Sequence, residues 1–353
     1  RNTTSLINPK KHFDTLLYTG NGASDHVITG LEFQPDFVWI KSRTNTRQGQ
    51  ISNSVVGAGK IQVPSESDAE QTISGVSSFN HNGFTVGSHA GANENSQNFV
   101  AWCWKAGGTA VANTDGDVTS QVSVNQEAGF SIVSWTTPSS GSGYSIGHGL
   151  GKIPELIMMK NRSTSNNWDI YHHGNGGSPD DYRLILNTND SRQSVSAWDD
   201  TPHTSTVFRS RTGGNWYNNG NNIIAYCWYS IPGYSAFGCY EGNGQSEGPY
   251  VYTGFRPAMI IVKSYSNSGS SYAFFMCDST REPRNSMYKR LVPNESEAET
   301  TNTGTTAYVD FYNDGFKFRG SGSMVNGNTV EYVYMAWAEQ STNTPFASEP
   351  NAR

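Results

Sequence analysis

Apolar residues gather in two kinds of strand-length run, and each kind occurs three times along the chain. The first kind follows a proline and ends in polar residues: "PDFVWIKSR" (35–43), "PELIMMKNR" (154–162) and "PAMIIVKSY" (257–265). The second kind is rich in aromatic residues and ends at a tryptophan: "FVAWCW" (99–104), "IIAYCW" (223–228) and "YVYMAW" (332–337). Runs of this length and composition predict β-strands.

The first kind of run is apolar on both faces of the strand that it predicts. Because successive side chains point to opposite faces, Phe37 and Trp39 share one face with Lys41, and Val38 and Ile40 share the other. A strand that is apolar on both faces is covered on both faces. We therefore expect it at the centre of a sheet, with a second layer or a neighbouring module over its other face.

Further landmarks recur in the same order around these runs. "YTGNG" (18–22) returns as "YEGNG" (240–244), and "SFNHNGFTV" returns as "DFYNDGFKF", whereas the middle copy keeps only Trp135 at the position of the first landmark. An ordered set of landmarks at this spacing indicates repeats. We predict three homologous modules: module 1 (1–108), module 2 (130–232) and module 3 (233–340), with a linker at 109–129 and a C-terminal tail at 341–353.

The sequence of each module predicts short strands separated by turn residues and no amphipathic helix. The 37 glycines and the many asparagines supply the turns, and two stacked antiparallel sheets are the natural way to bury such strands. The predicted class is all-β, with each module an antiparallel β-sandwich of jelly-roll or concanavalin-like type. We expect the recurring prolines to mark the first residue of a strand and the recurring tryptophans to lie in the core: Pro35, Pro154, Pro257, Trp39, Trp104, Trp228 and Trp337.

We predict structural rather than functional roles for the recurring lysines and for the cysteines. Each apolar run ends at a lysine (41, 160 and 263), whose stem can lie on apolar surface while its ammonium reaches water; contact with a ligand is the less favoured alternative. Cys103 and Cys227 occupy the same place as Ala336, which indicates a small buried site. We expect free thiols in the core for these residues and for Cys239 and Cys277, rather than disulfides.

Charge and hydropathy exclude several classes of partner. A formal net charge of −6 argues against nucleic acid and against an anionic membrane surface. No apolar run approaches the length of about 18 residues that a membrane-spanning helix needs, so we expect no membrane insertion. The chain starts at Arg1 without methionine, which suggests a processed product or part of something longer.

Four groups of residues could carry chemistry, and each has a structural alternative that we favour. "GYSIG" (143–147) followed by His148 matches the nucleophile-elbow pattern, but Ser145 lies in a predicted hairpin rather than between a strand and a helix. The acids Glu66, Asp68, Glu70, Glu295, Glu297 and Glu299 could serve hydrolysis or calcium, yet acids beside prolines favour solvated loops. "NTDGD" (113–117) lacks calcium-loop spacing, and His172 and His173 lack a third ligand. We predict no catalytic residue, no metal and no cofactor.

An Asn-rich tip precedes each closing strand, and only the tip of module 2 carries adjacent aromatic residues. The candidate ligand-binding residues there are Trp216, Tyr217, Asn218, Asn219 and Asn221. A ring could stack on a pyranose while the amides bind its hydroxyl groups. The alternative, which we favour, is that Trp216 caps the core or packs on a neighbouring chain.

The chain resembles virion structural and tail-fibre proteins of marine bacteriophages, including those that infect cyanobacteria. The likeness covers nearly the whole chain and is carried by "KHFDTLLYTGNG", "GLEFQPDFVWIKSR", "NGFTVG", "FVAWCWKAGG", "HGLGKIPELIMMKNR" and "YVYMAWAE". The ending "NTPFASEPNAR" is also similar to the ends of such proteins, which suggests a natural C-terminus. The resemblance implies a part of a phage particle, in an appendage that meets the host, and brings no active site. Module 2 lacks the "TGNG" turn, so the three modules need not share one function.

Two functions of different class remain, with an enzyme third. The first is a tail fibre or similar appendage that recognises a host-surface glycan or receptor, and the second is a purely structural virion protein without a ligand. Exposed aromatic residues on loops would favour the first, and large apolar surfaces buried between chains the second. A polysaccharide-degrading fibre is the third. By analogy with fibres, we expect a homotrimer that contacts other virion proteins, located in the virion and, during assembly, in the host cytoplasm.

Overall fold

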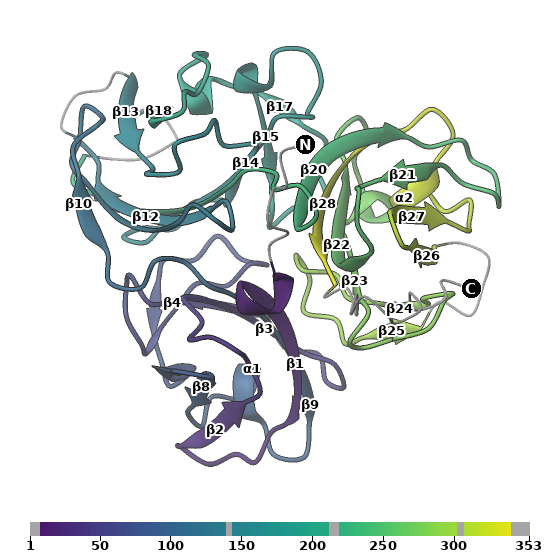
Figure 1. The fold of residues 1–353 in the computed structure, drawn as a ribbon, viewed down its shortest axis with the longest axis horizontal. Helices are drawn as coiled ribbons and strands as arrows, with labels where there is room; N and C mark the ends of the chain where they lie inside the picture. Colours follow the sequence, from purple (N-terminus) through teal and green to yellow (C-terminus); the bar gives the residue numbers. More distant parts are fainter. Residues whose placement is uncertain (1–7, 139–142, 212–218, 302–306, 340–353) are drawn as a thin grey trace, which may run out of the picture.

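Three lobes of β-structure surround a common centre (Figure 1). The computed structural model describes residues 8–138, 143–211, 219–301 and 307–339. The lobes follow one another along the chain, from purple through teal to green and yellow. Strands make up most of the regular structure, and the helices are single turns. The predicted all-β, sandwich-like class is therefore confirmed.

The elements of the three lobes have the following bounds. Module 1 contains η1 (Pro9–Lys11), β1 (Phe13–Thr19), β2 (His26–Thr29), β3 (Phe37–Ser42), β4 (Gln50–Asn53), β5 (Lys60–Ile61), β6 (Gln71–Thr72), β7 (Val76–Asn80), β8 (Gly83–Val86), α1 (Ala90–Asn93) and β9 (Asn98–Trp104). Module 2 and the segment before it contain β10 (Val111–Asn113), β11 (Ser120–Asn125), β12 (Phe130–Thr136), β13 (Gly143–Gly147), β14 (Leu156–Asn161), β15 (Asp169–His172), η2 (Pro179–Asp181), β16 (Tyr182–Ile185), β17 (Gln193–Ser194), η3 (Ser196–Trp198), β18 (Val207–Arg211) and β19 (Asn222–Trp228). Module 3 contains β20 (Ser235–Glu241), β21 (Tyr250–Tyr252), β22 (Pro257–Ser264), η4 (Ser270–Tyr272), β23 (Phe275–Asp278), β24 (Lys289–Arg290), β25 (Thr300–Thr301), β26 (Val309–Tyr312), β27 (Gly315–Phe318), α2 (Ser323–Asn326) and β28 (Glu331–Ala338).

The same strand order occurs in each lobe. One sheet has the order β1-β9-β3-β4, β12-β19-β14-β15 or β20-β28-β22-β23, and we call these the inner sheets. The second has the order β2-β8-β7, β13-β18 or β21-β27-β26, and we call these the outer sheets. The strands pair antiparallel throughout. A common origin of the three modules stays a prediction, and the shared strand order is what that origin would produce.

Two details differ from the expectations. The predicted linker at 109–129 contains β10 and β11. With β16 and β17 on the other side, they extend the inner sheet of module 2 to eight strands, and β11 pairs along the edge of β12. The recurring proline is the first strand residue only at Pro257; β3 and β14 begin two residues after Pro35 and Pro154.

Each inner sheet buries both of its faces, as the doubly apolar runs require. In β3, Val38 and Ile40 pack against Phe84 of the outer sheet in the core of module 1. Phe37 and Trp39 instead join a central cluster to which all three modules contribute. The neighbouring modules of the same chain thus cover the second face.

The closing tryptophans of the three modules meet at the centre. The ring centroids of Trp104 and Trp337 lie 5.1 Å apart, and Trp228 lies 6.3 Å and 6.1 Å from them, all edge to face. Each ring is at most 2% exposed. Their indole N–H groups have no hydrogen-bond partner in the described ranges, so aromatic packing holds this centre together.

The three lysines at the ends of the apolar runs are buried, which contradicts the expectation that their ammonium groups reach water. Lys41 Nζ donates to the carbonyl oxygen of Glu295 in module 3 at 2.5 Å, and Lys160 Nζ to that of Ser67 in module 1 at 2.7 Å. Lys263 Nζ donates within module 3. Burial lowers the pKa of each lysine to about 8. A neighbouring module covers each strand end, which one strand's sequence cannot reveal.

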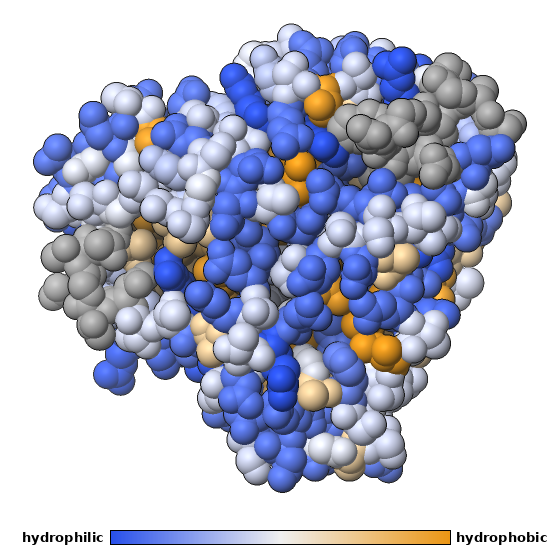
Figure 2. Space-filling model, turned by 180° about the vertical axis from the view of Figure 1, so that it is seen from behind, coloured by the Kyte–Doolittle hydropathy of each residue, from blue (hydrophilic) through white to orange (hydrophobic). Residues whose placement is uncertain are grey.

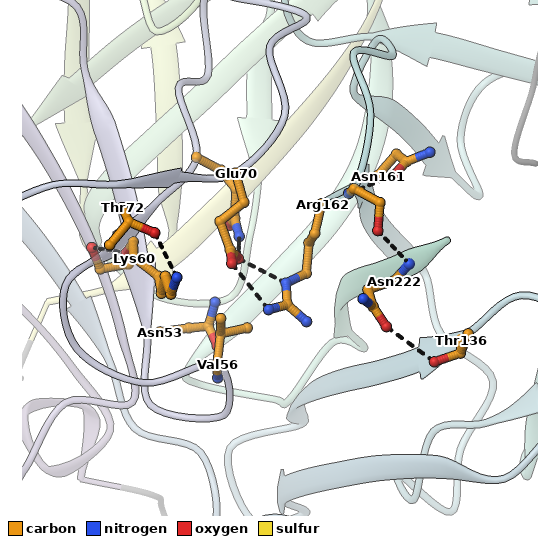
Figure 3. Close-up of polar contacts among 12 residues, drawn as sticks. Asn53, Val56, Lys60, Glu70, Thr72, Thr136, Asn161, Arg162 and Asn222 are labelled. Atoms are coloured by element: carbon orange, nitrogen blue, oxygen red, sulfur yellow. Dashed lines mark hydrogen bonds and ion pairs between the residues drawn. The ribbon is translucent and has the colours of Figure 1, made fainter. Parts of the chain in front are cut away.

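Two of the six acidic residues in the predicted solvated loops instead form ion pairs between modules. Arg162 of module 2 binds Glu70 of module 1 through two hydrogen bonds of 2.7 and 3.1 Å (Figure 3). Arg43 of module 1 binds Glu299 of module 3 in the same way, at 3.0 and 2.9 Å. Both glutamate side chains are only 10% exposed. The solvated-loop interpretation is therefore wrong for these two residues.

A buried polar residue ends the fourth strand of each inner sheet and contacts the closing strand of the next module. Asn53 donates to the hydroxyl of Tyr226 at 2.9 Å, and the Nε2 atom of His172 lies 3.1 Å from the carbonyl oxygen of Tyr334. Asp278 accepts a 3.1 Å hydrogen bond from the indole N–H of Trp102 in module 1. The contacts run from module 1 to 2, 2 to 3 and 3 to 1, so the lobes close a ring.

All four cysteines are free thiols, and three of them are buried. Cys103, Cys227 and Cys277 are buried free thiols, as predicted, but Cys239 is a free thiol on an exposed face of β20 and not in the core. The face shown in Figure 2 is mainly hydrophilic, with apolar residues in small separate spots.

Candidate functional site

The residues that resembled catalytic groups have structural partners. Ser145 lies within β13, not at a strand-to-helix turn, and its Oγ donates to Asp117 Oδ2 at 2.7 Å. His148 Nδ1 accepts from the backbone N–H of Leu150 at 3.2 Å, so its Nε2 donates to the carbonyl oxygen of Thr204 at 3.1 Å. Burial lowers the pKa of His148 to about 4. The serine and the histidine therefore do not form a nucleophile and base pair.

The sequence candidates for metal ligands do not come together. In "NTDGD", Asn113 and Asp115 bond to each other and Asp117 bonds to Ser145. His173 lies 2.9 Å from the carbonyl oxygen of Phe237, in line with a structural role. Within the described ranges, no group of three or more His, Cys, Asp or Glu side chains could hold a metal ion. In the same ranges, no helix combines the length and hydropathy that crossing a membrane requires.

The Asn-rich tips of modules 1 and 3 lock loops in place. Asn93 donates to the carbonyl oxygens of Ala23 and Gly87 at 2.7 and 3.0 Å. Asn326 does the same in module 3, with the carbonyl oxygens of Gln245 and Gly320 at 2.8 and 2.9 Å. These asparagines are buried, and each holds the "GNG" turn against a one-turn helix.

The ligand-binding residues predicted in module 2 are only partly described. Trp216, Tyr217 and Asn218 lie outside the described residues. Asn219 is exposed in a turn before β19. Asn221 is only 8% exposed and accepts a 3.1 Å hydrogen bond from the amide of Asn161 in β14, which gives it a structural role; its contact with a ligand stays a prediction.

A pocket on module 3 combines aromatic rings with hydrogen-bonding groups. It has a volume of about 330 Å³, which is within the range of ligand sites. It is lined by Glu247, Asn285, Ser286, Tyr288, Tyr308, Asp310, Tyr312 and Arg319. We call it the tyrosine pocket. The rings of Tyr288 and Tyr308 stack with centroids 5.1 Å apart.

Strand alternation builds the floor of this pocket. In β26, Val309 and Phe311 point into the core of module 3, so Asp310 and Tyr312 point outward. The side chain of Asn285 pairs with the backbone of Phe311 through hydrogen bonds of 2.8 and 2.9 Å. The segment that carries Tyr288 thereby lies along the free edge of β26 and forms one wall.

Arg319 organises the polar side of the pocket. Its guanidinium donates to Asp310 at 2.8 Å, to Glu247 at 2.5 Å and to the hydroxyl of Tyr312 at 2.6 Å. The other oxygen of Asp310 accepts from Ser286 at 2.6 Å. Burial lowers the pKa of Arg319, but the bond to Asp310 and the neighbouring acidic groups raise it by more, so the guanidinium stays charged. The orientation of these groups is thus fixed before any ligand arrives.

The same positions in module 1 carry small residues. The backbone N–H of Gly87 donates to the carbonyl oxygen of Gly75 at 2.8 Å. At the matching place in module 3, the backbone N–H of Arg319 donates to the carbonyl oxygen of Tyr308 at 2.9 Å. Tyr308 and Arg319 therefore correspond to two glycines. The fold of a module does not need the ring or the guanidinium.

Strand register gives the remaining correspondences. Asn80 lies opposite Gly83, as Tyr312 lies opposite Gly315. By the same pairing Ser78 corresponds to Asp310. Module 1 thus has the framework of the tyrosine pocket without its aromatic or charged side chains.

A second cavity, of about 500 Å³, lies where module 1 meets β11. One of its two carboxylates, Asp36, already accepts from the hydroxyl of Ser54 at 2.7 Å and from the backbone N–H of Ala106 at 2.8 Å. The imidazole of His12 is its only ring among the lining residues, and it bonds to Asn125 at 2.9 Å. This cavity is larger, but its polar groups serve the junction of the two modules.

Sequence comparison adds the family and nothing about its role. Residues 8–341 match a family described as a domain of unknown function, DUF7483. The chain belongs to this family. The match spans all three lobes, so the DUF7483 unit is the closed three-lobed ring and not a single sandwich. A search of curated proteins gave no match.

Proposed function

We propose that this protein is a non-enzymatic component of a bacteriophage particle, in a tail fibre or similar appendage, that binds a host-surface glycan in the tyrosine pocket. The proposal of a virion component rests on the resemblance of its repeated motifs to marine phage proteins. The proposal of glycan binding rests on one observation: module 3 carries Tyr308, Tyr312 and Arg319 where module 1 carries residues without rings or charges.

The chemistry of the pocket suits a sugar. A pyranose offers an apolar face that can lie on a tyrosine ring and hydroxyl groups that need donors and acceptors. The stacked rings of Tyr288 and Tyr308 supply the first. Glu247, Ser286 and Asp310 supply the second, in positions fixed by Arg319. A rigid pocket loses little conformational entropy on binding.

The test is binding of the full chain to soluble polysaccharides, measured as retardation in gels that contain dextran, galactomannan or alginate. We expect retardation by at least one polymer, and Tyr308→Ala should abolish it. The matched control is Ser78→Ala in module 1, which leaves the pocket intact. Equal retardation of the Tyr308→Ala variant would refute the pocket as the site.

The same assay separates the pocket from the loop of module 2. If the loop is the glycan site, Trp216→Ala and Tyr217→Ala will reduce retardation and Tyr308→Ala will not. If no polymer retards the chain, the purely structural virion protein becomes the better account. Antibody labelling of particles that contain the chain would then test its place in the virion.

Association of the chain with itself stays a prediction. Strands that are apolar on both faces would favour a homotrimer if other chains covered them, but their second faces are covered by the other modules of one chain. The remaining support is the analogy with fibres. Light scattering decides the question: a mass of three chains would confirm the trimer, and a monomer at high concentration would exclude it.

A further inference from the structure

The outer sheet of module 3 continues the tyrosine pocket as an open aromatic face. In β21, Val251 points into the core, so Tyr250 and Tyr252 point outward and are 45% and 68% exposed. The rings of Tyr250 and Tyr312 lie edge to face, 5.8 Å apart. Tyr312 therefore belongs to both the pocket and the face, and the two surfaces are continuous.

A glycine keeps the middle of this face flat. Gly315 in β27 lies between Tyr252 on one side and Tyr312 on the other. A Cβ atom there would come within 2.2 Å of the carbonyl oxygen of Val251, so no other residue fits. From β26 to β21 the face spans two strand spacings, about 10 Å. That distance exceeds the width of one sugar ring.

The cations of the face are paired with carboxylates. Lys317 Nζ lies 2.8 Å from Glu247, and Arg319 binds Glu247 and Asp310. The hydroxyl of Tyr250 donates to Asp314. Two cations thus pair with two of the three carboxylates, Tyr250 binds the third, and neither cation is left to bind an acidic ligand.

Resting on the proposed function, we propose that the ligand is an uncharged polysaccharide chain. One sugar lies in the tyrosine pocket, and the following sugars cross β27 at Gly315 and stack on Tyr252 in β21. The paired cations and the excess carboxylate select against acidic polymers such as uronates. The corresponding residue to Tyr252 in module 1 is Thr29, opposite Gly83, so module 1 lacks this aromatic face.

The test uses the full chain and oligosaccharides of increasing length cut from the neutral polymer that binds best, with calorimetry as the readout. Affinity should rise about tenfold from monosaccharide to tetrasaccharide, the gain expected from one or two added ring contacts. Tyr252→Ala should remove this gain and leave monosaccharide affinity unchanged, whereas Tyr308→Ala should weaken every length. Thr29→Ala is the matched control, and Tyr252 is exposed enough that its loss leaves the fold intact.

Each contrary outcome points to a different error. Equal affinity for all lengths would overturn the extended face and leave the pocket standing. Preference for alginate, with binding that falls as salt rises, would overturn the uncharged ligand. Absence of binding to every carbohydrate would overturn the proposed function and this inference together.

Discussion

The inner and outer sheets of this protein differ in how closely the three modules agree. In the inner sheets, Trp104, Trp228 and Trp337 occupy matching positions and contact one another at the centre. In the outer sheets, the matching positions hold Asn80 in module 1 and Tyr312 in module 3. The modules carry the same residue where that residue packs at the centre of the ring. They carry different residues where the side chain points outward and the fold does not constrain it.

This comparison separates stability from binding within one chain. A residue that recurs in all modules is explained by packing, because each copy meets the same neighbours. A tyrosine or an arginine that module 3 carries on its surface, and that module 1 lacks at the same position, has no such explanation. The predictions below test this separation.

The largest expected effect is on the centre of the ring. Trp104→Ala should lower the free energy of unfolding by about 3–5 kcal/mol, since a fully buried indole leaves a cavity among three modules. Tyr308→Ala should change it by less than about 1 kcal/mol, because the ring is half-exposed. Denaturant unfolding measures both. Similar losses for the two variants would contradict the separation.

A second large effect is expected at the interface of modules 3 and 1. Arg281 is buried and binds Asp278 and Glu299, at 2.5 and 3.0 Å. Removing its charge in Arg281→Met leaves two buried carboxylates and should cost about 3–5 kcal/mol. The control is Arg47→Met, which breaks a solvent-exposed pair with Glu94 and should cost far less, because water screens an exposed ion pair. Equal costs would show that the buried Arg281 does not stabilise this part of module 3 more than an exposed pair does.

Acid should destabilise module 2 in particular. Burial lowers the pKa of His148 to about 4 and those of His172 and His203 to about 3, from an ordinary value of 6.5. The unfolded chain takes up these protons below pH 6.5 and the folded chain does not, so stability is full above pH 6.5 and falls toward pH 4. Each histidine contributes a slope of about 1.4 kcal/mol per pH unit.

The matched variant for this prediction comes from module 1. His172→Asn introduces the residue that module 1 has at the same place, Asn53. It should reduce the slope of unfolding free energy against pH by about 1.4 kcal/mol per pH unit, the contribution of one proton, as measured by unfolding at a series of pH values. An unchanged slope would show that His172 is not held neutral in the fold.

The smallest effect concerns the thiols. An alkylating reagent should modify Cys239 in the folded protein within minutes and leave Cys103, Cys227 and Cys277 unmodified, because only the first is exposed. Mass spectrometry after denaturation should then find three free thiols. A link between Cys103 and Cys227 would contradict their positions in the cores of separate modules.

The sequence predicted the parts of the fold that depend on local pattern. Strands such as β3 and β9, their burial and the recurring tryptophans follow from alternation and repetition. The burial of Lys41 and the pairing of Glu70 with Arg162 could not be predicted, because they depend on how modules pack. The exposed position of Cys239 could not be predicted either, because the sequence does not show that β20 lies at the edge of its sheet.

The tyrosine pocket was missed for a related reason. Its residues are spread from Glu247 to Arg319 and carry no local motif; strand pairing in the outer sheet brings them together. One signal was present: "FYNDGF" in module 3 has Tyr312 where "FNHNGF" in module 1 has Asn80. The comparison of module tips found Trp216 and Tyr217 by the same logic, at a place outside the described residues.

The most direct test of the central claim converts the outer sheet of module 3 toward that of module 1. The variant carries Tyr252→Thr and Tyr312→Asn, each the residue of module 1 at the same register, and its equilibrium binding to the neutral polysaccharide is measured beside its thermal melt. The account predicts loss of most of the affinity, by about a hundredfold for two lost ring contacts, with little change in melting temperature. Full affinity in a folded variant would contradict it.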